Sequence, residues 1–104
     1  MERVAFVMQL HKGCEDEYRR RHQSIWPELA ALLRETGIRD YSIFLEETTL
    51  KLFAILQIDK AGKLDNLAAN PVMRMWWDHM KDLMDTNADG SPVVTGLKEM
   101  FYLP

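Results

Sequence analysis

The stretch Glu15–Leu33 constrains the fold most, because its charges leave one direction in which a helix could pack. Three acid-to-base pairs stand four residues apart, the favourable order for ion pairs on a helix surface: Glu15/Arg19, Asp16/Arg20 and Glu17/Arg21. Residues four apart form one lane along a helix, and successive residues lie about 100° apart around its axis. These three lanes therefore cover most of the helix circumference with charge. The lane left over holds Cys14, Tyr18 and His22. We therefore expect Tyr18 and His22 to lie one turn apart, on the side of the helix that faces the protein.

Four further segments have the apolar alternation or composition of β-strands. They are Arg3–Leu10, Arg39–Glu46, Lys51–Ile58 and Lys98–Leu103. The second and third are separated only by Glu47–Leu50, which predicts a hairpin. Two helical regions lie between the strands, and a proline interrupts each, because proline lacks the N–H that a helix interior needs. These regions are about Cys14–Gly37, broken at Ser24–Pro27, and Ala61–Met84, broken at Asn70-Pro71; Asp85–Gly96 is left as a long loop.

The resulting order, β-α-β-β-α-β, predicts an α+β fold: a ferredoxin-like split βαβ with a four-stranded antiparallel sheet, in one domain over residues 1–104. Helices in that arrangement cover one face of the sheet. A sheet with one wet face should carry polar residues there, yet both faces of these strands are apolar. One face holds Val4, Phe6, Met8, Tyr41, Ile43 and Leu45, and the other holds Val7, Phe44, Phe53 and Ile55. We therefore expect a homodimer, in which a second copy covers the second face.

Composition argues against several classes of partner. The net charge of −3, and the acidic partners within the only basic run, argue against nucleic acid and anionic membranes. A single cysteine excludes an internal disulfide framework and fits a reducing compartment. Because the sequence shows neither a leader pattern nor a long apolar run, we expect no membrane span and a cytoplasmic location.

Motifs for common cofactors are absent from the sequence. It contains no GxxxxGK[ST] or GxGxxG for phosphates and dinucleotides, and no GxSxG nucleophile turn. The histidines His11, His22 and His79 do not have metal-ligand spacing, and one cysteine cannot form a zinc knuckle. We therefore expect neither a cofactor nor a metal. The remaining candidates for chemistry are imidazole and aromatic side chains.

His22 is the clearest of these candidates, since an unperturbed imidazole titrates close to neutral pH and can act as a general acid or base. A half-buried histidine bonded to a backbone carbonyl is an equal alternative from the pattern alone. Tyr18 shares the lane of His22, so both could line one pocket. We expect His11 and His79 to be structural or to face solvent, and the arginine run to form a solvated face.

Trp76 and Trp77 lie about 100° apart on a helix, so the two indoles cannot occupy one core position. We expect one in the core and the other against a ligand, a partner chain or a cleft wall. Tyr41 begins the second strand, from which its hydroxyl could reach the mouth of a cavity. Such a set of groups suits a small neutral ligand, and a sugar, an aromatic compound or a polyketide fits it about equally.

Four segments together resemble the L-rhamnose mutarotase family over the whole chain: YRRRHQSIWPEL, DYSIFL, RMWWDHM and the terminal FYLP. The resemblance implies a homodimeric α+β barrel that interconverts the α and β anomers of L-rhamnose without a cofactor. It implies His22 as the proton donor and Tyr18, Tyr41, Trp76 and Trp77 as sugar-binding residues. Two alternatives remain: a cofactor-free monooxygenase on the same dimeric barrel, and a non-catalytic sugar-binding module.

Overall fold

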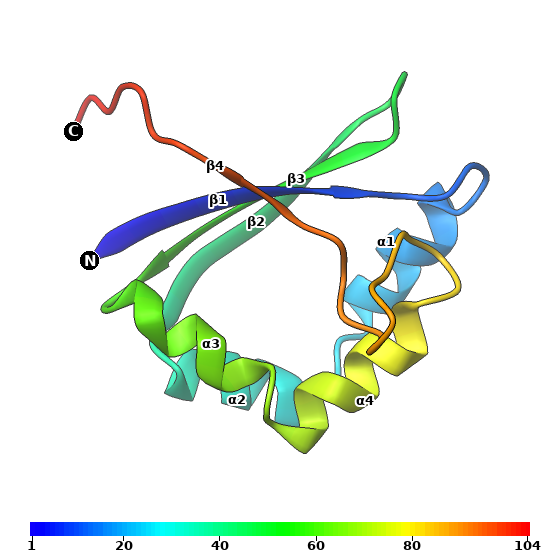
Figure 1. Cartoon of the computed structure of the whole chain (residues 1–104), viewed down its shortest axis with the longest axis horizontal. Helices are drawn as coiled ribbons and strands as arrows, with labels where there is room; N and C mark the ends of the chain where they lie inside the picture. The colour runs from blue at the N-terminus through cyan, green and yellow to red at the C-terminus, as the bar shows by residue number, and fades with distance from the viewer.

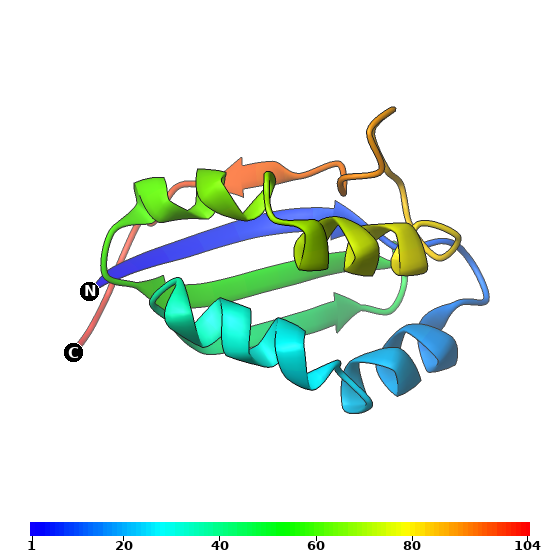
Figure 2. The same ribbon diagram turned by 90° about the horizontal axis from the view of Figure 1, so that it is seen from below.

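The computed structural model describes all 104 residues and contains a four-stranded antiparallel sheet with its helices on one face (Figure 1). The elements in chain order are β1 (Glu2–Gln9), α1 (Glu15–Gln23), α2 (Pro27–Glu35), β2 (Ile38–Glu46), β3 (Lys51–Ile58), the 3-10 turn η1 (Ala61–Lys63), α3 (Leu64–Leu67), α4 (Pro71–Met80) and β4 (Thr95–Leu97). The strands lie in the order β2-β3-β1-β4. Figure 2 looks at the sheet through the helices that cover it. The predicted split βαβ fold is confirmed.

Prolines separate the helices where the sequence predicts. Pro27 and Pro71 each occupy the start of a helix, where the missing N–H has no intrahelical partner to lose. Before α4, the side chain of Asn70 accepts a hydrogen bond of 2.9 Å from the Val72 N–H and so caps the helix. None of the helices has the length and apolar character needed to cross a membrane.

The prediction for the last strand is wrong. Residues 98–104 have no regular structure, and the strand is instead β4, which lies at the end of the segment expected to be a loop. Its register pairs Leu97 with Ala5, so only the first residues of β1 remain as partners for a longer strand. Arg3 contacts the tail through its side chain instead, with an ion pair of 2.7 Å to Glu99 and its guanidinium 3.3 Å from the centre of the Tyr102 ring.

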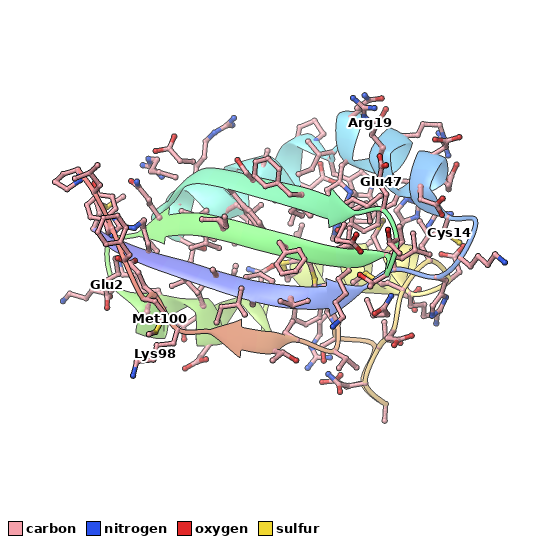
Figure 3. The ribbon with its side chains drawn as sticks, turned by 90° about the horizontal axis from the view of Figure 1, so that it is seen from above. Glu2, Cys14, Arg19, Glu47, Lys98 and Met100 are labelled. Atoms are coloured by element: carbon pink, nitrogen blue, oxygen red, sulfur yellow. The ribbon has the colours of Figure 1, made fainter.

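The two faces of the sheet are both apolar, as predicted, but only one is covered. The covered face contributes the buried residues Met8, Ile38, Leu52, Ala54, Leu56 and Ile58 to the core. Figure 3 looks onto the other face, where no helix lies. On that face Phe44, Ile55 and Leu97 are 61%, 42% and 45% exposed.

A bulge in β2 sets which side chains of that strand face the helices. Arg39 pairs with Gln57 but Ser42 pairs with Ile55, so β2 carries one extra residue between these pairs. Asp40 has φ of +50° there, a left-handed conformation that aspartate tolerates better than most residues. Because side chains alternate along a strand, one inserted residue reverses the alternation that follows. Tyr41 therefore points to the covered side, as does Ile38 before the bulge.

Gly37, between α2 and β2, gives a testable prediction for stability. It has φ of +99°, and a Cβ there would clash with Oδ1 of Asp59. Gly90 has a similar φ of +87° with nothing within 4 Å of its Cβ position, so it is a matched control. An alanine at positive φ costs about 1–2 kcal/mol of the free energy of unfolding. We expect G37A to lose more than G90A in urea unfolding, because Asp59 must also move; equal losses would contradict the clash.

Candidate active site

An open cavity of about 1540 Å³ lies between the helices and the covered face of the sheet. Two-thirds of the residues that line it are hydrophobic, 23 of 35. All five side chains singled out from the sequence line this one cavity: Tyr18, His22, Tyr41, Trp76 and Trp77. They come from three separate elements, α1, β2 and α4, so the fold brings together residues that lie far apart in the chain.

The inward lane of α1 is as predicted. Tyr18 is 8% exposed, His22 is half-buried, and their ring centres lie 4.4 Å apart. Nδ1 of His22 lies 3.0 Å from the carbonyl oxygen of Tyr18. A carbonyl oxygen can only accept, so Nδ1 carries the hydrogen and donates it, which leaves Nε2 as the nitrogen available to a ligand. Burial lowers the pKa of His22, and the hydrogen bond to the Tyr18 carbonyl opposes this shift.

Trp76 is the core member of the tryptophan pair. It is 6% exposed and stands edge-on to His22, with ring centres 5.4 Å apart and an interplanar angle of 88°. Trp77 is half-buried and also lines the cavity. The expectation that only one indole enters the core is therefore confirmed.

Two aromatic neighbours of Trp76 lie outside the set predicted from the sequence. The ring of Trp26 meets Trp76 edge-on at 5.1 Å, and His79 lies 5.4 Å from Trp26 and 5.6 Å from Trp76. His79 is exposed, as expected, yet it closes this aromatic cluster. Helical spacing could have indicated His79, which follows Trp76 by three positions in α4, but not Trp26, because α1 ends at Gln23.

Tyr41, on β2, lines the cavity near Tyr18. Its side chain is 38% exposed along the open space, and desolvation by the surrounding protein raises the pKa of Tyr41 to about 12. Burial also raises the pKa of Tyr18, and the neighbouring Tyr41 adds to that shift. Both phenols therefore stay neutral near pH 7, so they can donate and accept hydrogen bonds but do not act as bases.

The predicted ion pairs of α1 are only partly present. Glu17 and Arg21 pair at 2.7 Å, as expected, but Arg20 also donates to Glu17, at 2.8 Å from Nε, instead of pairing with Asp16. The two arginines lower the pKa of Glu17 to about 2. The expected pair of Glu15 with Arg19 does not form either, and both residues line the cavity.

Arg21 also corrects the expectation of a fully solvated arginine face. Its side chain is only 14% exposed, because it reaches across to the end of α4. It donates hydrogen bonds of 2.9 Å to Oδ1 of Asp82 and 2.6 Å to the carbonyl oxygen of His79. Charge-assisted bonds of this kind are stronger than neutral ones, so Arg21 ties α1, which carries His22, to the segment that carries Trp76.

The donor groups needed for a metal ion do not converge anywhere in the chain. Groups of three or more histidine, cysteine, aspartate or glutamate side chains that could hold an ion are absent. The single cysteine, Cys14, is a free thiol that packs against the core. The cavity therefore offers imidazole, phenol, indole and carboxylate groups to a ligand.

Comparison with known proteins identifies relatives of this chain. The sequence profile described as L-rhamnose mutarotase matches residues 3–103. A protein from Burkholderia ambifaria (strain MC40-6), named L-rhamnose mutarotase, is 52% identical over 104 residues, with 100% of both chains covered. The crystal structure of an L-rhamnose mutarotase from Formosa agariphila is 43% identical, with 100% of both chains covered and a TM-score of 0.93.

A more distant structure shares the fold alone. A protein from Deinococcus radiodurans, described as an antibiotic biosynthesis monooxygenase, has a TM-score of 0.62 at 12% identity, with 99% of this chain and 97% of that chain covered. Fold likeness at this identity carries no activity with it. The profile match and the 52% identity extend over the whole chain, and both have the same description. The chain belongs to the L-rhamnose mutarotase family.

Proposed function

We propose that this chain is an isomerase that interconverts the α and β anomers of L-rhamnose in the cavity between α1, α4 and the sheet. Family membership supports the substrate and the reaction. The observation that carries the site assignment is the position of His22, which lines the cavity between Tyr18 and Trp76 with Nε2 free for a ligand. Anomer exchange needs an acid, a base and an oriented sugar, and these groups can supply the acid and the orientation.

The proposed chemistry begins with ring opening. The imidazolium of His22 donates the proton on Nε2 to the ring oxygen, the bond between that oxygen and C1 breaks, and the anomeric hydroxyl loses its proton to water. The product is the open-chain aldehyde. After rotation about the C1–C2 bond, the former ring hydroxyl attacks the other face of the aldehyde and neutral His22 takes its proton back. The carbonyl oxygen takes back the proton held by water and becomes the new anomeric hydroxyl. The cycle is proton-neutral and involves no oxidation or reduction, as general acid–base catalysis requires.

The remaining side chains hold the sugar in this proposal. Tyr18 and Tyr41 remain neutral, so their hydroxyls can exchange hydrogen bonds with sugar hydroxyls. Trp77, the more exposed of the two indoles, packs against the apolar edge of the sugar at its 6-methyl group. Trp76 is buried in the core and holds the ring of His22 at its edge.

NMR saturation transfer between the anomeric protons of L-rhamnose tests this function. We expect the wild-type protein to speed the transfer between the α and β signals. A sugar-binding module would bind rhamnose in a saturable way without faster exchange. A monooxygenase would consume oxygen with electron-rich aromatic substrates and leave the sugar exchange unchanged. Either of these results would contradict the proposal.

We also propose that the protein acts as a homodimer, the dimeric α+β barrel, in which a second copy covers the bare face of the sheet. Phe44 pairs with Phe53 across the strands, and Phe53 pairs with Val7, so an apolar ladder crosses that face. The C-terminal residues Met100, Phe101 and Leu103 are 84%, 80% and 78% exposed and extend on the same side of the sheet (Figure 1). A second copy offers an identical apolar surface, as a two-fold interface requires.

We further propose that the protein acts in the cytoplasm, since a single free cysteine is compatible with a reducing compartment.

A charged residue on this face should separate the dimer. We expect F44D to convert the protein to a monomer in multi-angle light scattering, because the substitution would bury a carboxylate between two sheets. Met75 on α4 is 63% exposed, like Phe44, but lies on the helical side, so M75D is the control and should stay dimeric. A wild-type monomer, or a dimer that survives F44D, would contradict this interface.

A further inference from the structure

We propose that Asn87 determines sugar specificity, because its side-chain oxygen accepts a hydrogen bond from the 4-hydroxyl of L-rhamnose. This inference rests on the proposed mutarotase function and deepens it. It adds a residue from the segment between α4 and β4, which supplies none of the five site residues predicted from the sequence.

The segment between α4 and β4 forms one wall of the cavity. Asn87, Ser91 and Pro92 all line it. The segment folds back on itself there, because Thr86 and Pro92 form an isolated antiparallel bridge. Within that bridge, the Asn87 N–H donates a hydrogen bond of 2.7 Å to the carbonyl oxygen of Ser91. Backbone pairing thus holds the side chain of Asn87 at the cavity.

The hydrogen bonds of the Asn87 side chain fix which end of its amide can receive a sugar hydroxyl. Nδ2 lies 3.1 Å from Oγ of Ser91 and 3.2 Å from the carbonyl oxygen of Pro92. A carbonyl oxygen can only accept, so the nitrogen end of the amide must lie there. The hydroxyl of Ser91 donates to Asp89, so it too accepts from Nδ2. Both N–H groups are therefore used within the segment, and Oδ1 is the atom that the amide offers to a ligand.

Asn87 lies beside the face of α4 that carries Trp77. It is exposed, and besides the main cavity it lines a second, polar pocket together with Arg74 and Lys81. Arg74, Trp77 and Lys81 follow one another at intervals of three and four residues, so they share one face of the helix. Of these three, only Trp77 lines the main cavity. Asn87 and Trp77 are therefore neighbours where the two pockets adjoin, and a sugar against the indole can reach the amide.

The order of these residues matches the order of groups around the sugar ring. In L-rhamnose, C5 carries the 6-methyl group and is bonded both to the ring oxygen and to C4. The proposed function places the ring oxygen at His22 and the methyl group at Trp77. In Figure 2, α4 lies between α1, which carries His22, and the segment that carries Asn87. The 4-hydroxyl is the hydroxyl closest to the methyl group along the ring, so it is the donor for Oδ1 of Asn87.

The C4 epimer of L-rhamnose, 6-deoxy-L-talose, tests this contact in the full chain, because its 4-hydroxyl points to the other face of the ring. The loss of one neutral hydrogen bond changes an equilibrium by about three- to tenfold. By polarimetry, we expect the wild-type kcat/KM for L-rhamnose to exceed that for the epimer by this factor. N87A should raise KM for L-rhamnose by about the same factor, change kcat by less than about twofold and remove the preference between the two sugars.

The variant N87D separates a binding role from a purely structural one. Aspartate keeps an acceptor oxygen but loses both N–H groups, so a structural role predicts that N87D behaves like N87A. We expect N87D instead to keep the preference for L-rhamnose. The control is N66A, since Asn66 in α3 is exposed and does not line the cavity. N66A should leave KM, kcat and the preference unchanged.

Three results would overturn the role of Asn87 and leave the proposed function standing. They are a wild-type enzyme without a preference between the two sugars, an N87A protein that keeps the preference, and an N87D protein that loses it. The comparison of the two sugars on the wild type does not depend on the folding of any variant. A wild-type protein that does not speed anomer exchange of L-rhamnose would instead overturn the proposed function.

Discussion

Replacing His22 with alanine is expected to slow the exchange of L-rhamnose anomers by about 10²–10⁴-fold, the usual contribution of a positioned acid or base. His22 lies near the end of α1, and its ring makes one hydrogen bond, to the carbonyl of Tyr18 in the same helix. Its loss should therefore leave the fold in place. Saturation transfer measures the exchange, and light scattering measures whether the variant keeps the oligomeric state of the wild type.

The pH dependence of kcat/KM tests which form of His22 acts. Burial lowers its pKa, so the neutral ring dominates near pH 7 and the imidazolium grows as the pH falls toward that lowered pKa. If His22 acts as a proton donor, kcat/KM of the wild type should therefore rise with falling pH, and H22A should lack this rise. The matched control is H79A, which removes an exposed imidazole of the same aromatic cluster and should keep the rise. Full activity in a folded H22A protein would contradict the assignment.

Replacing Trp76 with alanine should cause the largest loss of stability among the site residues, about 3–5 kcal/mol in the free energy of unfolding. Trp76 is buried and packs against His22, Trp26 and His79, so its removal leaves a cavity lined by three rings. Urea unfolding monitored by circular dichroism measures the loss. The variant W76F should recover part of it, because a phenyl ring fills part of the space.

Trp77 provides the comparison for this prediction. Its indole is half-buried and lines the cavity, so W77A should lose less stability than W76A and should raise KM for the sugar. If the two variants lost equal stability, the division of the pair into a core residue and a binding residue would be wrong. If W77A kept the KM of the wild type, Trp77 would not contact the sugar.

Sequence periodicity predicts those parts of the fold that local physics determines. The inward lane of α1 follows from its being the one lane without an acidic residue or an arginine, and the structure places Tyr18 and His22 there. The hairpin of β2 and β3 follows from a short link between two apolar runs, and the two breaks in the helices follow from the prolines. Each of these predictions needs information from fewer than about ten neighbouring residues.

The errors arise where a distant segment decides the structure. Large apolar residues in the tail favour a strand, but the register of β4 leaves it only the first residues of β1 as partners. Arg21 was expected in solvent because α1 alone offers it only Glu17, whereas Asp82 lies 61 residues away in sequence. Trp26 joins the aromatic cluster through its contact with Trp76 of another helix, which spacing within one helix does not reveal.

The bulge at Asp40 divides β2 into two parts, and the alternation of side chains between the two faces of the sheet is reversed from one part to the other. Before the bulge, Ile38 faces the covered side of the sheet, and after it Tyr41 and Ile43 face that side. Deletion of this one residue would therefore exchange the two faces, turning Ser42 and Phe44 toward the cavity and the phenol of Tyr41 away from it. A single position of the backbone thus decides which aromatic ring of β2 faces the cavity, the phenol of Tyr41 or the phenyl ring of Phe44.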